Sequence, residues 1–131
     1  MGSIANILQA TKAINPSIKQ IESADAVLIL GEDVTNTAPR VALALRQSVR
    51  NKAFELAEQM GLPSWQDAAV RNLAQDQRSP MTIVSAMDTR LDDVASTCVS
   101  LAPDDIAAFG YAVAAALAGE STDNAQADAT A

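Results

Sequence analysis

Histidine is absent from this chain of 131 residues, and cysteine occurs once, as Cys98. Without an imidazole, catalytic triads that need a histidine base are excluded, as are the usual mononuclear zinc sites. A single cysteine cannot close an internal disulfide, and we predict it to be a buried thiol inside a strand. Gly31 stands alone after an apolar run, so neither glycine-rich phosphate-binding pattern is present, and dinucleotide or P-loop binding is not supported.

Basic residues are also scarce, since nine Lys and Arg stand against sixteen Asp and Glu and give a net charge of −7. This balance argues against a nucleic-acid-binding protein or a basic membrane-surface module. No apolar stretch reaches the roughly 20 residues of a membrane-spanning helix, and no basic segment precedes an apolar one at the start. We therefore expect a soluble, cytoplasmic protein that binds no nucleic acid and does not insert into a membrane.

Apolar residues make up 49% of the chain. This content, in a chain of this length, is enough for one compact domain with a core. The sequence predicts an N-terminal helical lead-in over 1–15, an α/β domain over 16–118 and a flexible acidic tail over 119–131. Ile4, Ile7 and Leu8 have helical spacing in the lead-in. The tail is small, polar and acidic, and offers little to bury.

The most informative stretch is the apolar run 26–30, which stops in a polar loop from Glu32 to Thr37. Unbroken Val, Ile and Leu are typical of a strand that is covered on both faces. One long amphipathic helix is predicted to follow, with Pro39 in its first turn and Gly61 at its end. Its apolar stripe consists of Val41, Leu45, Val49, Ala53, Leu56 and Met60.

The basic residues of this helix are interpreted as a solvated face, with a phosphate-binding or partner-binding surface as the alternative. They are Arg40, Arg46, Arg50 and Lys52. In the segment that follows, Ser64 is predicted to cap the next helix, with Asp67 in its first turn and Trp65 as a packing anchor.

The second half of the chain predicts two strands and a final helix. The runs 82–86 and 97–101 are rich in β-branched residues, and one or two helical turns are expected over 87–95 between them. Pro103 begins the last helix, whose predicted core face consists of Ile106, Phe109, Gly110, Val113 and Leu117. Strands that alternate with helices predict a three-layer α/β/α fold with a parallel sheet of about three strands in sequential order.

Ligands of open α/β sheets bind at the carboxyl ends of the strands, so the loop 32–37 is the first place to look for function. The adjacent carboxylates Glu32-Asp33 and Asp92-Asp93 are expected to be solvated or capping rather than general acids or bases. We identify no catalytic residue and no metal ligand.

Three segments carry a family resemblance: 24–35 (ADAVLILGEDVT), 39–47 (PRVALALRQ) and 88–95 (DTRLDDVA), with the strand and helix after Thr97. They resemble the molybdopterin-oxidoreductase-type domain. More narrowly, they resemble that domain in the G subunit, the 75-kilodalton-type large chain, of bacterial proton-translocating NADH–quinone oxidoreductase, respiratory complex I. The resemblance runs from about Pro16 to Leu117. It implies a Rossmann-like half-domain, excised from a large subunit whose iron–sulfur clusters lie elsewhere.

The resemblance also bears on cofactor binding. In molybdenum enzymes of this superfamily, loops equivalent to 32–37 and 85–90 face a guanine-dinucleotide pterin, and the second strand ends in an Asp-Pro-Arg-like sequence. Ser85 holds the acidic position here, whereas Thr89 and Arg90 fit the pattern. The resemblance to complex I therefore implies that cofactor binding is lost.

The function implied is that of a non-catalytic scaffold in the peripheral arm. Its partners would be other parts of the parent subunit and neighbouring peripheral-arm subunits, and it would hold no cofactor of its own. The alternative is a nucleotide- or pterin-binding domain of a molybdopterin oxidoreductase that still uses Asp33, Thr35, Thr89 and Arg90.

Overall fold

The computed structural model describes residues 14–118, so the predicted tail and nearly all of the predicted lead-in lie outside the described residues. The division of the chain into three parts stays a prediction. The elements, in chain order, are α2 (Ile18–Glu22), β1 (Val27–Leu30), α3 (Val34–Thr37), α4 (Pro39–Ser48), α5 (Asn51–Gln59), α6 (Asp67–Ala74), β2 (Met81–Ser85), β3 (Thr97–Ser100) and α7 (Pro103–Leu117).

The three strands form one parallel sheet in the order β1-β2-β3, as the sequence predicted. Leu30 of β1 lies opposite Val84 of β2, and Ile83 of β2 lies opposite Cys98 of β3. The central strand is the most buried, since Met81 to Val84 are all inaccessible to solvent or nearly so. Helices cover β2 on both faces, which explains why its apolar residues do not alternate with exposed polar ones.

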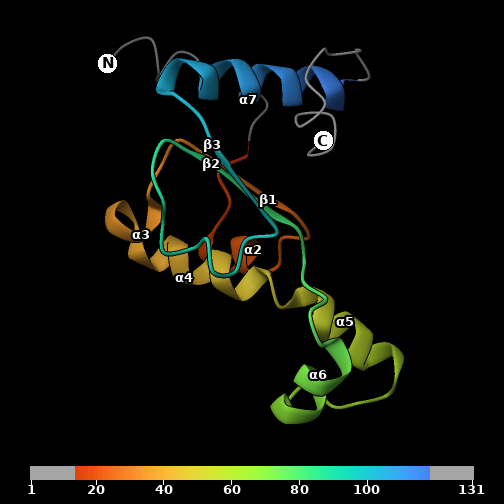
Figure 1. Cartoon of the computed structure of the whole chain (residues 1–131). Coiled ribbons are helices and arrows are strands. Elements are labelled where there is room, and N and C mark those ends of the chain that lie inside the picture. The colour runs from red at the N-terminus through yellow and green to blue at the C-terminus, as the bar shows by residue number, and fades with distance from the viewer. Residues whose placement is uncertain (1–13, 119–131) are drawn as a thin grey trace.

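Helices cover both faces of the sheet, which confirms the predicted three-layer arrangement. On one face, Ile29 and Ile83 pack against Leu45 of α4. On the other face, Val84 packs against Phe109 of α7 and its neighbours. Figure 1 shows α7 on one side of the strands and α2, α3 and α4 on the opposite side, with the hairpin of α5 and α6 extending away from the sheet.

The prediction of one long helix over 39–60 was wrong, because the helix breaks between α4 and α5 at Val49 and Arg50. The break is held by Ser79, which lies just before β2 and is buried. Its backbone N–H donates to the Val49 carbonyl at 2.9 Å, and its hydroxyl accepts from the Lys52 N–H at 3.1 Å. Ser79 thus satisfies backbone groups that a continuous helix would have paired internally.

Three other local predictions about the helices were wrong. Trp65 is 79% exposed, so it is no packing anchor. Ser64 does not cap α6, which begins at Asp67 without a side-chain cap and buries Val70 and Ala74. Leu117 is exposed at the end of α7, whereas Ile106, Phe109 and Val113 are buried as expected.

The segment around β3 departs from its prediction in one respect, the exposure of Cys98. Before β3, residues 90–94 form turns, and the Ala95 N–H donates to the Leu91 carbonyl at 3.1 Å, which closes one helical turn within the expected range 87–95. Cys98 is exposed, and it lies on β3, an edge strand of the sheet formed by the described residues. Edge strands expose what central strands bury, and the apolar neighbours of Cys98 in the sequence do not reveal which kind of strand they form.

Candidate functional site

The loops after β1 and β2 start side by side at the carboxyl edge of the sheet. The Gly31 N–H donates to the Val84 carbonyl at 2.7 Å, which extends the strand pairing by one residue. Gly31 has a φ of +71°, a conformation that side chains with a Cβ rarely adopt. The chain therefore turns sharply from β1 into the first candidate loop. The loop with Asp33 and Thr35 and the loop with Thr89 and Arg90 thus share one edge, as the sequence predicted.

In the first loop, the Asp33 carboxylate is used to cap the short helix α3. One of its oxygens accepts from the Thr35 N–H at 3.1 Å, and the other accepts from the Asn36 side-chain amide at 2.5 Å. The hydroxyl of Thr35 is different, because its Oγ1 atom is buried and has no hydrogen-bond partner in the part of the chain that the structure describes. A buried hydroxyl without a partner is uncommon in folded proteins.

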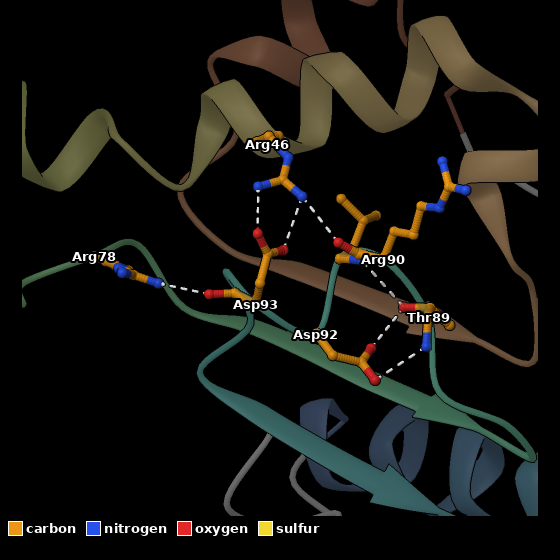
Figure 2. A network of polar contacts seen from close by, with 7 residues as sticks. Arg46, Arg78, Thr89, Arg90, Asp92 and Asp93 are labelled. Carbon is orange, nitrogen blue, oxygen red and sulfur yellow. Dashed lines mark hydrogen bonds and ion pairs between the residues drawn. The ribbon is translucent and has the colours of Figure 1, made fainter.

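In the second loop, the Thr89 side chain is paired with Asp92. The hydroxyl donates to one Asp92 carboxylate oxygen at 2.6 Å, and the Thr89 N–H donates to the other at 3.0 Å, as Figure 2 shows. Ser85 closes its own turn, with its hydroxyl bonded to both backbone groups of Met87. Within residues 14–118, no hydrogen bond links Asp33 or Thr35 to the second loop.

Two arginines hold the second loop from outside. Arg46 of α4 donates to both carboxylate oxygens of Asp93, each at 2.8 Å, and to the backbone carbonyl of Arg90 at 2.9 Å. Arg78 donates to the backbone carbonyl of Asp93 at 3.2 Å. Figure 2 shows both guanidinium groups reaching Asp93, while the Arg90 side chain extends away from them.

This contact was not predicted from the sequence, because Arg46 was assigned to a solvated face and Asp93 to a solvated pair. Residues 47 positions apart share no local pattern. The hydrogen bond from Arg46 is the main cause that holds the pKa of Asp93 below its ordinary value, and it raises the pKa of Arg46 in turn.

We expect the Asp93 carboxyl to titrate below its ordinary pKa of 3.8. A carboxyl whose pKa is lower in the folded than in the unfolded state stabilises the fold above the unfolded-state pKa. That stabilisation is lost as the pH falls through the folded-state pKa. The substitution Arg46→Met should move the pKa of Asp93 up towards 3.8, as measured by a carboxyl carbon NMR titration. Arg40→Met, on the same helix, is the control, and an unchanged Asp93 pKa in Arg46→Met would contradict the assignment.

A small cavity of about 150 Å³ lies between the second loop and β3, lined in part by Asp88, Asp92 and Cys98. Partial desolvation by the neighbouring loop raises the pKa of the largely exposed Cys98 thiol, and the carboxylates of Asp92 and Asp88 raise it further. Within residues 14–118, no group of three or more His, Cys, Asp or Glu is placed to hold a metal ion.

Together, these features define an open α/β domain whose sheet-edge loops use most of their polar groups on their own turns. None of the helices described over 14–118 has the length and apolar character to cross a membrane. The cofactor-binding role of Asp33, Thr35, Thr89 and Arg90 stays a prediction.

Comparison with known proteins shows which proteins this chain is similar to. The chain matches no protein-family model. It is 49% identical over 114 residues to the G subunit of the NADH-quinone oxidoreductase of Pseudomonas fluorescens, a match that covers 87% of this chain and 13% of that relative. It is 49% identical over 109 residues to the G subunit of Shewanella oneidensis, covering 83% of this chain and 12% of the relative. The G subunit of Escherichia coli K12 is 44% identical over 111 residues, covering 85% of this chain and 12% of the relative.

The chain is therefore homologous to one segment of the G subunit of NADH-quinone oxidoreductase, which confirms the resemblance found in the sequence. It spans about an eighth of the length of these curated relatives, between 12% and 13%.

Proposed function

We propose that this chain is a structural segment of the G subunit of a complex I, and that it contributes packing surfaces rather than reaction chemistry. The name shared by its relatives supports membership of an NADH–quinone oxidoreductase complex. One observation carries the scaffold role: two of the four candidate side chains, Asp33 and Thr89, are engaged within their own loops. The Asp33 carboxylate caps α3, and the Thr89 hydroxyl is bonded to Asp92.

The partner that we propose for the packing surface is the remainder of the parent subunit, together with neighbouring peripheral-arm subunits on the cytoplasmic side. Val27 and Gly31 direct their N–H groups to β2, so the alternation of a parallel strand directs the backbone of Leu28 and Leu30 to the outer edge of β1. The Leu30 side chain beside this edge is 41% exposed. Among residues 14–118, no strand pairs with this edge, and such an edge is a site for further pairing or cover. Iron–sulfur clusters would lie in other parts of that subunit.

A second candidate function, binding of a nucleotide or pterin, is favoured by the Thr35 hydroxyl. Its buried, unpartnered oxygen lies in the loop at the carboxyl end of β1, where ligands of open α/β sheets bind. A ligand that bonded this hydroxyl would satisfy it. Ser85 weighs against this function, because its hydroxyl is already bonded to Met87 and it offers no carboxylate for a ribose.

A binding experiment separates the two functions. We expect no saturable binding of guanosine diphosphate, NADH or a reduced pterin tighter than millimolar in titration calorimetry. The side chains of Asp33 and Thr89 are engaged within their loops, and no glycine-rich turn offers backbone donors to a phosphate. Chemical-shift mapping on the full chain locates the residues that contact any ligand that binds. Saturable binding with shifts at Asp33, Thr35, Thr89 and Arg90 would overturn the scaffold role.

Two matched variants make the result specific. If a ligand binds at this edge, Thr35→Val should weaken it by removing only the hydroxyl, by about 1 to 3 kcal/mol for a lost hydrogen bond to a charged group. Thr37→Val, two residues further on, is the control, because the Thr37 hydroxyl donates to the backbone carbonyl of Asp33. Equal effects of the two variants would place the ligand elsewhere.

A further inference from the structure

A groove lined by four arginines lies where the break between α4 and α5 meets the end of α6. Its volume is about 270 Å³, and Arg46, Arg50, Arg71 and Arg78 all line it. These are four of the nine basic residues of the whole chain, which has a net charge of −7. The acidic composition of the chain does not predict such a cluster of positive charge.

The arginines are only partly neutralised. Asp93 pairs with Arg46, while Asp67 is shared between Arg50 and Arg71. Arg78 donates to a backbone carbonyl, which carries no net charge. Within residues 14–118, four guanidinium groups thus pair with two carboxylates, an excess of two positive charges, and no Asp or Glu of this range lines the groove.

The guanidinium groups retain unused capacity for binding. An arginine has five N–H donors, and the side chain of Arg71 is 71% exposed and is paired with Asp67 alone among the described residues. Arg50 is half-exposed and also lies over the Phe54 ring. Guanidinium groups pair well with carboxylates, in a geometry that two parallel hydrogen bonds can fix.

The floor of the groove is apolar, and this decides between possible occupants. Val49 and Ala74 are buried there, and Ala53 and Val94 complete the surface. Arginines pair with phosphates as well as with carboxylates, but a bare phosphate would leave the apolar floor uncovered. A peptide with separated carboxylates and small apolar side chains would place carboxylates at the separate arginines and apolar side chains on the groove's apolar floor.

The geometry points to a docking groove for an acidic peptide segment of a partner protein, in which Arg71 and Arg78 bind carboxylates and the apolar floor receives aliphatic side chains. This inference does not rest on the scaffold role. The groove is lined by residues of α4, α5, α6 and the segment before β2, and Val94 is its one lining residue from the loop after β2. The nucleotide experiment concerns other residues, namely 33–35 and 89–90.

The probe for the test is a short, dye-labelled peptide of alternating Glu and Leu, titrated against the full chain and followed by fluorescence anisotropy. We expect saturable binding that weakens with salt. The double variant Arg71→Gln/Arg78→Gln should weaken it by about tenfold or more, as expected for lost charge pairs. Lys19→Gln, on α2, changes the net charge by one unit outside the groove and should leave binding unchanged. A peptide with Lys in place of Glu should not bind.

Further measurements keep the test independent of folding. Circular dichroism should show that the double variant unfolds at nearly the same temperature as the parent chain, since both side chains are exposed. Arg71→Gln alone, which leaves Arg78 in place, is the fallback if the double variant is unstable. Methyl shifts on peptide binding should fall on Val49 and Val94. No saturable binding at low salt, or equal binding by the parent and these variants, would overturn the proposal. Displacement of the peptide by inorganic phosphate at equimolar concentration would also overturn it, in favour of an anion site.

Discussion

Truncation of Phe109 to alanine is expected to lower the free energy of unfolding by about 3 to 5 kcal/mol. Phe109 is 1% exposed and packs against Val84, Ile106 and Val113, so the substitution leaves a cavity between α7 and the sheet. The loss is a large share of the roughly 5 to 15 kcal/mol that stabilises a typical domain. Denaturant unfolding, followed by circular dichroism, measures it.

Tyr111 provides the matched control on the same helix. It is an aromatic residue that is 79% exposed, so Tyr111→Ala should change the free energy of unfolding by about 0.5 kcal/mol or less. If Phe109→Ala does not fold at all, Phe109→Leu keeps most of the side-chain volume and should still be measurably less stable than Tyr111→Ala. Similar effects of the Phe109 and Tyr111 variants would show that α7 does not pack on the sheet through Phe109.

The sequence predicts the sheet well, because its signals are local and strong. The run at 26–30 is apolar without alternation, and β1 is indeed covered by helices on both faces. Strand order and direction follow from the connections, since a helical crossover favours a parallel neighbour. The helical spacing of apolar residues also predicts the core face of α7 correctly as far as Val113.

The break between α4 and α5 is not readable in this way. The apolar stripe passes through Val49 without interruption, and Ser48 and Arg50 are both tolerated in helices. What ends α4 is Ser79, which is distant in the sequence and reaches the backbone of Val49 and Lys52 only after the chain has folded. Tertiary contacts of this kind override local propensity.

The loops that carry the candidate residues do lie at the edge of the sheet, but the hydrogen bonds of their side chains were not foreseen. The pattern of Thr89 followed three residues later by Asp92 is a capping signal that could have shown that the threonine hydroxyl is engaged. Asp33 before Thr35 and Asn36 is a similar signal. The role of Arg46 has no such signal, because its partners lie on a loop that only the fold brings near.

The substitution Leu91→Ala is also expected to have a large effect, lowering the free energy of unfolding by about 2 to 5 kcal/mol. Leu91 lies in the loop between β2 and β3, yet it is 3% exposed and packs with Ile29, Leu45 and Ile83. It therefore fixes the loop to the core below α4, in the position where Arg46 reaches Asp93 and the Arg90 carbonyl. Denaturant unfolding gives the stability, and hydrogen exchange of the loop amides gives its local opening.

Met87 is the control in the same loop, since it is 79% exposed and Met87→Ala should have little effect on stability. If Leu91 positions the loop, Leu91→Ala should also speed exchange of the Thr89 amide and move the pKa of Asp93 up towards 3.8, because the contact with Arg46 is loosened. A variant that loses stability while both readouts stay unchanged would mean that Arg46 holds the loop by itself. In that case the arginine, and not the leucine, would determine the conformation of the second candidate loop.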